Sequence, residues 1–295
     1  MLRIKLFFRA IRAAFLPASV IPVISAAAYN YYLHSSFRFS RFFLHLFCTV
    51  CFHSASNVMN DYDDYRSGCD AMNRDYISPF TGGSRMIQEG LVSPDYVKKL
   101  AMTLFGLGIL SGMILTFSVH YSVAIFFPPA LIGGYFYARF FARYGFGEII
   151  IFLHFGILTT LSAFYVQSMS INAGVILLAV INGIFVMNIL VINETPDMEA
   201  DRKAGKKTIM VRYGKTGGLY LYLLFYAVGY GVIGIGAAFG EFPVNSLGAL
   251  FSIILCLSAF YAAMKKDRRN VHKAIILTIA NQVMTGLILT IIFLI

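Results

Sequence analysis

Charged side chains are scarce in this chain of 295 residues. Asp, Glu, Lys and Arg make up only 13% of it, whereas hydrophobic residues make up 58%. An ordinary soluble domain has about 25% charged and 45–50% apolar residues. The scarcity of charge therefore excludes a soluble globular enzyme and a disordered chain, and it indicates a polytopic membrane protein.

Cysteine is rare as well, with four residues at positions 48, 51, 69 and 256. Cys48 and Cys51 form a CxxC pair inside an apolar segment, where small buried thiols pack like other apolar side chains. We therefore expect no redox or metal site at this pair. A cleavable signal peptide is not evident, so the first apolar segment is expected to span the membrane.

The apolar segments predict an all-α fold. A hydrocarbon core about 30 Å thick needs roughly 20 apolar residues of helix, and nine segments meet this requirement. An outer-membrane β-barrel is excluded because the apolar runs are continuous and do not alternate. We expect a single integral domain over residues 1–295, with spans near 13–33, 41–59, 100–118, 121–138, 148–168, 173–192, 218–240, 246–264 and 274–295.

The basic residues predict how the spans are oriented. With the N-terminus inside, 22 of the 24 Lys and Arg lie on the inner side, and only Arg38 and Arg41 lie outside. By the positive-inside rule this favours a cytoplasmic N-terminus and an outer C-terminus. The plasma membrane is the expected location. Inner loops of this kind account for the net charge of +10, so no nucleic-acid partner is expected.

Thirteen of the 14 acidic residues are expected on the same inner side, and only Glu241 is expected outside. Two long inner loops are expected there, near 60–99 and 193–217, and any chemistry should take place in them. The first acidic cluster follows the second span. Asn60 and Asp64 are four residues apart, so on a helix they share a face, which His53 and Asn57 continue into the membrane.

The second acidic cluster follows the sixth span. Asn193, Asp197 and Asp201 are again spaced by four residues, and Pro196 is expected to kink or restart the helix. A basic segment that contains Lys206 and Lys207 comes directly after the cluster.

Carboxylates this close repel one another unless cations lie between them. Mg²⁺ is commonly held by one or two carboxylates and by the phosphate oxygens of a substrate. Two matching clusters therefore predict a magnesium–diphosphate site between two helix ends. Solvated acidic loops with ordinary helix capping are the structural alternative. A cation-coupled transporter is the functional alternative, although transporters place ionisable groups near the membrane midplane.

The motifs that contain these residues resemble those of a known protein family. The chain is similar to the UbiA superfamily of intramembrane prenyltransferases over nearly its whole length, and within it to the 1,4-dihydroxy-2-naphthoate prenyltransferases. The matching motifs are Asn60-Asp61-Tyr62-Asp63-Asp64-Tyr65 with Gly68 and Asp70, Pro79-Phe80-Thr81-Gly82-Gly83-Ser84-Arg85, Gly145-Phe146-Gly147-Glu148, Tyr165-Val166-Gln167, Asn193-Glu194 with Asp197 and Asp201, Gly205-Lys206-Lys207-Thr208 and Val211-Arg212-Tyr213-Gly214.

The resemblance implies nine transmembrane helices and transfer of an isoprenyl chain from its diphosphate to an aromatic acceptor. It implies Mg²⁺ as cofactor, with two ions expected, and 1,4-dihydroxy-2-naphthoate as the acceptor, which loses CO₂ on the way to menaquinone. A hydroxybenzoate, homogentisate, a phenazine or a glyceryl phosphate are alternative acceptors. A scaffold without activity is disfavoured, because the acidic positions of both motifs are intact.

Spacing and resemblance together assign roles to the candidate site residues. Asp61 and Asp70 are expected to assist catalysis beside the metal ligands. The residues expected to hold Mg²⁺ are Asn60, Asp64, Asn193, Asp197 and Asp201. Those expected to bind the substrates are His53, Asn57, Arg85, Arg139, Arg143, Lys206 and Lys207.

Other polar positions have two interpretations each. Polar groups inside the membrane either form helix–helix hydrogen bonds, which is their commoner use, or bind the substrate. We expect the first of His154, Gln167, Asn281 and Gln282. Glu148 either stabilises a helix N-terminus or takes part in catalysis. The Gly82-Gly83 pair is expected to permit a tight loop over the site, and it is not a P-loop because no Gly-Lys-Ser/Thr ending follows.

Overall fold

The structure is a computed structural model that describes residues 2–265 and 267–295. All the regular structure in these residues is helical, and nine helical segments are long and apolar enough to cross a membrane. This confirms the predicted fold class. The nine segments are Ala13–His34, Phe39–Ser67, Pro94–Ser118, Tyr121–Ala142, Gly147–Ser168, Ala173–Lys203, Ile209–Ala238, Val244–Met264 and Arg268–Leu294.

Some of these spans are single α-helices and others combine several kinds of helix. The α-helices are α1 (Leu2–Ala10), α2 (Pro17–His34), α3 (Phe39–Ser67), α4 (Cys69–Met72), α5 (Pro94–Ser118), α6 (Phe127–Phe136), α7 (Gly147–Ile151), α8 (Thr159–Ser168), α9 (Ala173–Lys203), α10 (Ile209–Ala238), α11 (Ile253–Met264) and α12 (Arg268–Leu294). The 3₁₀ segments are η1 (Ala13–Phe15), η2 (Tyr121–Phe126) and η5 (Val244–Ser252), and the π-helical segments are η3 (Tyr137–Ala142) and η4 (Phe152–Leu158).

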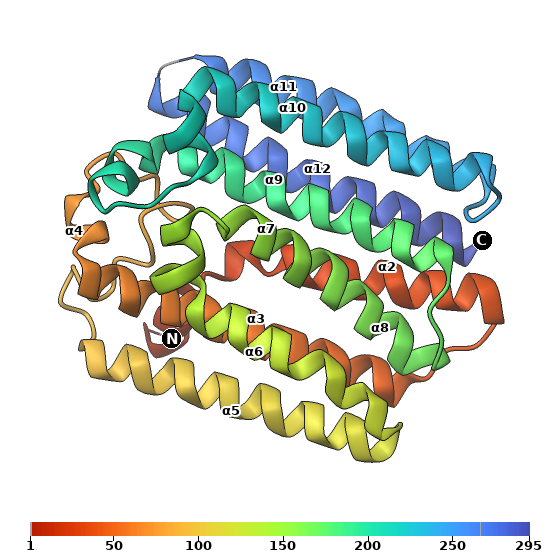
Figure 1. Ribbon diagram of the computed structural model, residues 1–295. Helices are drawn as coiled ribbons and strands as arrows, with labels where there is room; N and C mark the ends of the chain where they lie inside the picture. Colours follow the sequence, from red (N-terminus) through yellow and green to blue (C-terminus); the bar gives the residue numbers. More distant parts are fainter. Residues whose placement is uncertain (1, 266) are drawn as a thin grey trace.

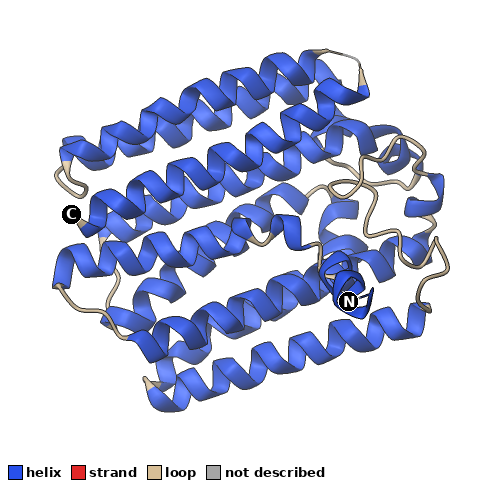
Figure 2. Cartoon of the chain, turned by 180° about the vertical axis from the view of Figure 1, so that it is seen from behind, coloured by secondary structure: helices blue, strands red, loops and turns tan. Residues whose placement is uncertain are grey.

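The long helices lie side by side and form one bundle (Figure 1). Helix α3 packs against α5, α9 packs against α10, and α12 packs against both α2 and α11. Seen from behind, the chain begins at one end of the bundle and finishes at the other (Figure 2). Opposite ends are the expected result of an odd number of spans.

Several helices are longer than the sequence analysis expected. Helices α5, α10 and α12 begin earlier, at Pro94, Ile209 and Arg268, and two other helices end later. Helix α3 continues to Ser67, where Gly68 with φ +75° ends it, and α9 continues to Lys203. The expected loops near 60–99 and 193–217 are therefore shorter, because their first and last parts are helical. Pro196 neither ends nor restarts α9 in the described chain. Both acidic clusters consequently lie on rigid helix ends.

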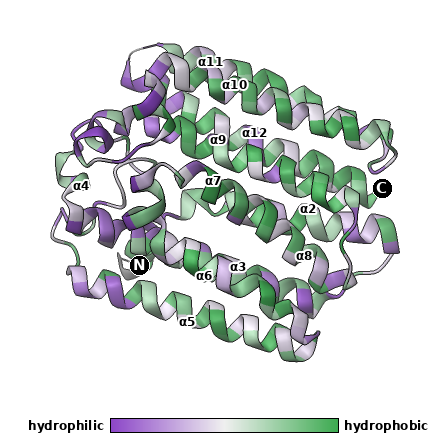
Figure 3. Cartoon of the chain, viewed as in Figure 1, coloured by the Kyte–Doolittle hydropathy of each residue, from purple (hydrophilic) through white to green (hydrophobic). Residues whose placement is uncertain are grey.

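Polar residues are concentrated at one end of the bundle, which carries α4 and the loops before α5 and α10 (Figure 3). The length of the helices is largely apolar in the same view. Small residues bring the site helices together, because a Cβ atom on Gly156 of η4 would collide with the backbone of Gly183 on α9. Close packing through glycine is a common way for membrane helices to associate. It holds η4 close to the middle of α9.

Candidate active site

A cavity of about 190 Å³ opens at the polar end of the bundle. Carboxylates and amides line its outer part, and apolar side chains of η4, α7 and α9 line the part nearer the membrane interior. These apolar residues are Ile150, Ile151, Phe155, Val186, Ile189 and Leu190. A second cavity of about 70 Å³ shares His53, Ser56, His154 and Phe155 with the first and continues it between α3, α6 and α8. A polar head group and an apolar tail would thus find matching surroundings.

Helix α3 supplies one polar wall of the cavity. His53, Asn57, Asn60 and Asp64 all line it, as expected of residues three and four apart on a helix. The amide of Asn60 donates to Asp64 Oδ2 at 3.1 Å, and the amide of Asn57 donates to the carbonyl of Ile11 at 3.0 Å. These hydrogen bonds fix the orientation of the two amide side chains on this face of α3.

Helix α9 supplies the facing wall with Asn193, Asp197 and Asp201. The structure therefore brings both acidic clusters to a single cavity, although more than 100 residues of chain separate them. Asn193 Oδ1 is buried and has no hydrogen-bond partner in the described chain. A buried oxygen of this kind costs free energy unless a ligand satisfies it.

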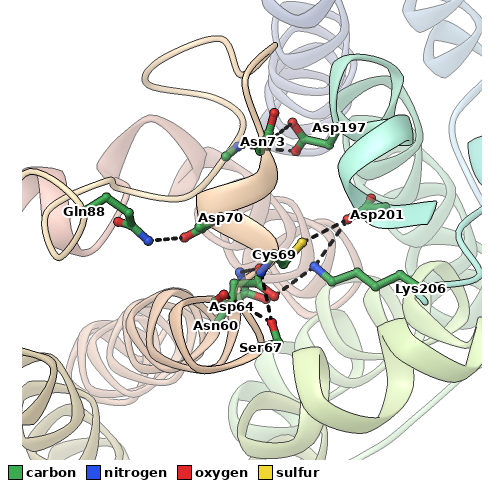
Figure 4. A network of polar contacts seen from close by, with 11 residues as sticks. Asn60, Asp64, Ser67, Cys69, Asp70, Asn73, Gln88, Asp197, Asp201 and Lys206 are labelled. Carbon is green, nitrogen blue, oxygen red and sulfur yellow. Dashed lines mark hydrogen bonds and ion pairs between the residues drawn. The ribbon is translucent and has the colours of Figure 1, made fainter. Parts of the chain in front are cut away.

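Lys206 lies between the two walls (Figure 4). Its ammonium is 2.9 Å from Asp64 Oδ1 and 3.4 Å from Asp201 Oδ1. Burial disfavours the charged ammonium, but the carboxylates of Asp64 and Asp201 outweigh this and hold the pKa of Lys206 well above its ordinary value. A positive charge therefore occupies the point on which the two carboxylates converge.

The loop between α4 and α5 closes over this centre. Asn73 donates to Asp197 Oδ1 at 2.7 Å (Figure 4). The backbone N–H of Gly82 donates to Asp197 Oδ2 at 3.3 Å. Gly82 and Gly83 have φ +72° and +73°, which L side chains rarely adopt. A Cβ atom on Gly83 would lie only 2.8 Å from Asp70 Oδ2, so the loop approaches the carboxylates more closely than a side chain would permit.

Asp61 and Asp70 flank the loop rather than face each other across the cavity. Asp61 is buried and accepts a hydrogen bond from the backbone of Ser84 at 3.0 Å, and it does not line the cavity. Asp70 does line it and accepts a hydrogen bond from Gln88 at 3.0 Å. Burial, together with the nearby carboxylates of Asp64 and Asp61, raises the pKa of Asp70 to about 8.

The predicted basic residues divide into one that lines the cavity and four that do not. Lys206 lines it. Arg139 forms a two-bond ion pair with Asp63, at 2.7 and 3.1 Å, and is absent from the cavity wall. Arg85 donates to the backbone carbonyl of Asp70 and covers the ring of Tyr76, whereas Arg143 and Lys207 are exposed to solvent.

Several cavity residues were not identified from the sequence. In the sequence analysis Arg12 was only one of the 22 basic residues that indicate the orientation of the spans. The structure places it in the wall of the cavity, together with Asn73 and Tyr137. Arg12 precedes η1 and Asn73 lies in a loop, so no periodic pattern marks either of them. The π-helical geometry of η3 and η4, a frequent sign of functional sites, is also invisible in the hydropathy pattern.

The remaining intramembrane polar groups are mostly structural. Gln167 accepts from the backbone of Arg38 at 2.9 Å, Asn281 accepts from Tyr230 at 2.9 Å, and Gln282 donates to the carbonyl of Pro17 at 3.4 Å. Glu148 accepts from the backbone of Ile209 at 2.5 Å and so caps the N-terminus of α10, which favours its structural interpretation. His154 differs, since it lines both cavities.

The sequence of the chain also matches a known protein family. The model of the UbiA prenyltransferase family matches residues 19–282, which is most of the chain. The chain belongs to the UbiA prenyltransferase family. It is therefore an integral membrane enzyme that transfers prenyl groups, and its nine candidate spans carry the family fold.

Among UbiA relatives, the chain is similar to two proteins with the same name. It is 28% identical to a 1,4-dihydroxy-2-naphthoate octaprenyltransferase of Haemophilus influenzae, over 72% of this chain and 70% of that protein. It is 27% identical to the protein so named in Mycobacterium tuberculosis, over 76% of this chain and 79% of that one. A UbiA homologue from Archaeoglobus fulgidus, solved with DMAPP and Mg²⁺ bound, superimposes with a TM-score of 0.68 at 14% identity, over 97% of this chain and 99% of that one.

The donor groups in this UbiA chain fit a divalent cation that a substrate helps to hold. Within residues 2–265 and 267–295, no three His, Cys, Asp or Glu side chains enclose a common point. Mg²⁺ does not need such a cage, since it usually takes one or two carboxylates together with phosphate oxygens and water. Asp64 and Asp201 already converge on one cation, the Lys206 ammonium, and Asn193 adds an unused oxygen.

Proposed function

We propose that this enzyme transfers an isoprenyl chain from its diphosphate to 1,4-dihydroxy-2-naphthoate, with Mg²⁺ as cofactor and with loss of CO₂. The observation that carries the proposal is the pair of facing carboxylates, Asp64 and Asp201, around one cation at the mouth of a cavity with apolar inner walls. The diphosphate belongs at this mouth and the isoprenyl chain belongs deeper among the helices.

The charge of the cavity favours two magnesium ions. Five carboxyl side chains line it, and only two Lys or Arg side chains among the described residues do so. The five are Asp64, Asp70, Glu194, Asp197 and Asp201, and the two are Arg12 and Lys206. Asp70, with a pKa of about 8, is mostly protonated at neutral pH, but the carboxylates that are ionised would still repel a diphosphate. Asn60, Asp64 and Asn193 would hold the ions together with Asp197 and Asp201, and bound Mg²⁺ would neutralise the charge that develops on the leaving group.

The chain's own residues then have distinct tasks. Lys206 is placed to donate to the diphosphate oxygens once its partner carboxylates hold metal. The C–O bond of the donor breaks with its electron pair going to the diphosphate, which leaves an allylic cation. Tyr137 and Phe155 line the cavity, and an aromatic ring beside such a cation can attract it. The electron-rich acceptor attacks it, a C–C bond forms, and loss of CO₂ restores the aromatic ring.

The names of the two UbiA relatives support the naphthoate as acceptor. Hydroxybenzoate, homogentisate, phenazine and glyceryl phosphate acceptors are the alternatives that the same chemistry would serve. A cation-coupled transporter is disfavoured, because Asp64 and Asp201 lie in the last turns of α3 and α9, and hydrophilic residues gather at that end of the bundle (Figure 3).

The decisive experiment uses purified protein in detergent with Mg²⁺, farnesyl or geranylgeranyl diphosphate, and 1,4-dihydroxy-2-naphthoate. Mass spectrometry should detect a prenylated, decarboxylated product that is absent when EDTA replaces Mg²⁺. Binding of the diphosphate without any product would overturn the naphthoate assignment and direct the search to the other acceptors. Absence of both product and binding would contradict the proposed reaction altogether.

We also propose that the site faces the cytoplasm, on the strength of the 22 basic residues at that end. All four native cysteines are buried, so an introduced thiol can be labelled selectively. Lys203→Cys at the site end should resist an impermeant maleimide in intact cells and react after lysis. Ser170→Cys, between α8 and α9, should react in intact cells. The reverse pattern would invert the assigned orientation.

A further inference from the structure

The first helix, α1, carries large apolar side chains on its outer face. This outer face consists of Ile4, Phe7 and Phe8, each of which is between 40% and 62% exposed. Residues three and four apart share a face of a helix, so the three side chains lie together. Leu6 and Ala10 point the other way, because both pack in the buried core of the chain. The helix is therefore apolar on two opposite sides, and the described chain covers only the inner one.

Helix α1 does not continue into the first span. Arg12 separates the two with a left-handed backbone, φ 52° and ψ 54°, so the chain changes direction before η1. The nine residues of α1 form a helix about 14 Å long, which is too short to cross a bilayer. A short helix with an exposed apolar face and basic residues typically lies in the plane of the membrane surface.

The packing of α1 places it near the level of the lipid headgroups. Ala10 belongs to the same buried cluster as Val97, in the first turn of α5. Lys98 and Lys99 are exposed directly after Val97, and Met102 begins the exposed apolar side of the same helix. Basic residues followed by apolar ones are typical of the boundary between headgroups and acyl chains. The outer face of α1 thus lies where it can enter the leaflet.

The surroundings of the outer face favour lipid over a protein partner. Helix α5, which packs in the same cluster, exposes apolar side chains such as Leu110 and Phe117 along its membrane span. The lipid that covers α5 therefore reaches α1 without a change of partner. Lys5 is exposed on the flank of the outer face. An exposed lysine at this level is attracted by anionic headgroups.

Helix α1 is also bonded to the loop that closes over the site. Arg9 Nε donates to the carbonyl of Ser84 at 2.8 Å, and Arg9 Nη2 pairs with Glu89 at 2.5 Å. Ser84 directly follows Gly83 of the loop, and its backbone N–H donates to Asp61 at 3.0 Å. A displacement of α1 would therefore pull on the loop next to the carboxylates.

We propose that α1 is an interfacial helix whose outer face enters the lipid leaflet at the site end of the bundle, with Lys5 at anionic headgroups, and that Arg9 transmits this attachment to the loop over the site. An anionic bilayer surface thus helps to keep the loop closed. The inference goes beyond the proposed reaction and holds for any of the possible acceptors.

The position of α1 is tested first. The chain contains no tryptophan, so a single introduced tryptophan reports its own surroundings. Phe8→Trp tests the outer face. Phe117→Trp on α5 is the lipid-facing reference, and Met72→Trp is the solvent reference, because Met72 is exposed on α4 at the polar end of the bundle (Figure 1). Each full-length variant is checked by thermal melting and reconstituted in vesicles of phosphatidylglycerol and phosphatidylcholine with brominated acyl chains.

Bromine should quench Phe8→Trp at least about half as strongly as Phe117→Trp, because both side chains lie among acyl chains. Met72→Trp should be quenched only weakly. Quenching of Phe8→Trp that is no stronger than that of Met72→Trp would overturn the attachment to lipid.

Hydrogen exchange of residues 82–89 in the same vesicles tests the link to the loop. Arg9→Gln and the double variant Phe7→Ser with Phe8→Ser should each raise the exchange rate of this loop by about 5- to 10-fold, because each removes a restraint on it. Phe43→Ser is the matched control for the loss of an exposed aromatic ring, since Phe43 lies in the first turns of α3 at the other end of the bundle. It should leave the loop within about twofold of wild type.

The lipid composition tests the role of charge. Vesicles of phosphatidylcholine alone should raise loop exchange in wild type by about fivefold, the factor expected for one lysine at an anionic surface. Lys5→Gln should reduce this sensitivity to lipid. Equal sensitivity of wild type and Lys5→Gln would overturn the role of Lys5 at the headgroups.

The two parts of the proposal fail in different ways. If Phe8→Trp is quenched but no variant of α1 changes loop exchange, the transmission through Arg9 is wrong. If the double variant changes loop exchange but Phe8→Trp is not quenched, a protein surface or a second copy of the chain covers α1 and the lipid assignment is wrong. If the double variant does not fold, Arg9→Gln and the comparison of lipids still decide. None of these measurements requires turnover, so their failure leaves the proposed reaction untouched.

Discussion

Lys206 offers the sharpest test of how the two acidic clusters are held together. Its side chain is 13% exposed, and those of Asp64 and Asp201 are 10% and 9% exposed. In the Lys206→Met variant, both carboxylates would face each other without a cation. Removing one partner of a buried ion pair typically costs about 3–5 kcal/mol, because the other charge stays buried and unpaired. At about 2 °C per kcal/mol for a chain of this size, the melting temperature in EDTA should fall by about 6–10 °C.

Mg²⁺ should reverse this loss. Without the competing ammonium, the two carboxylates form a better site for the metal alone, so saturating Mg²⁺ should raise the melting temperature of Lys206→Met more than that of wild type. Turnover should nevertheless remain low, because the ammonium that contacts the diphosphate is missing. The assay is thermal melting in detergent, with and without Mg²⁺, followed by product formation.

Lys207→Met is the matched control for stability, since it removes the same charge from the next residue, which is exposed. It should melt within about 1 °C of wild type in EDTA, as surface substitutions usually do. If Lys206→Met and Lys207→Met melt alike in EDTA, the ammonium does not hold the clusters together. If Mg²⁺ stabilises wild type and Lys206→Met equally, the ammonium and the metal do not share a position.

Three further predictions concern other parts of the site. Asp197→Ala should lower turnover by about 10²- to 10³-fold in the product assay with the protein still folded, because it removes an oxygen donor and the anchor of the loop; near-normal transfer would contradict this. Gly83→Ala should lower turnover about tenfold, because the added Cβ would lie 2.8 Å from a carboxylate oxygen of Asp70. Gly90→Ala is the control, since Gly90 has a similar φ of +69° but nothing within 4 Å, and it should lower stability without lowering turnover. Equal effects of the two variants on turnover would show that backbone strain alone is responsible. Arg139→Gln should change the KM for the diphosphate less than about twofold, because Arg139 pairs with Asp63 away from the cavity, and a large rise in this KM would place it at the substrate.

The two helix faces of the site could be predicted from the sequence. Residues spaced by three and four share a face of any helix, so the positions of Asn60, Asp64, Asn193 and Asp197 on cavity walls follow from local geometry. The spans follow equally directly from the thickness of the bilayer. The extents of α3, α5, α9, α10 and α12 were misjudged, because one end of each helix contains polar or charged residues and hydropathy alone does not distinguish a polar helix end from a loop.

The cations of the site could not be ranked in the same way. Lys206 and Lys207 are adjacent and chemically identical, yet one ammonium is buried between two carboxylates and the other is exposed. The difference arises from the turn after α9, in which Gly205 has φ +76° and the N–H of Lys206 bonds back to the carbonyl of Asp201. Arg12 reaches the cavity through a bond to Phe80, 68 residues further along the chain. Such contacts depend on tertiary packing and leave no local pattern.

The structure also divides the oxygen donors into two groups. Asp64 and Asp201 share the Lys206 ammonium, so a metal ion need only displace one flexible side chain to reach them. Asp197 is different, because Asn73 and the backbone of Gly82 occupy both of its oxygens. Each oxygen keeps a second lone pair, but the two bonds fix the direction in which the carboxylate can offer it to an ion. We expect the first ion to bind at Asp64 and Asp201 and the second to bind more weakly while the loop holds Asp197. An Asn73→Ala variant, with the loop anchor weakened, should therefore bind the second Mg²⁺ more tightly in a calorimetric titration with an unreactive prenyl diphosphate analogue. An unchanged second step would show that the loop bonds do not compete with the metal.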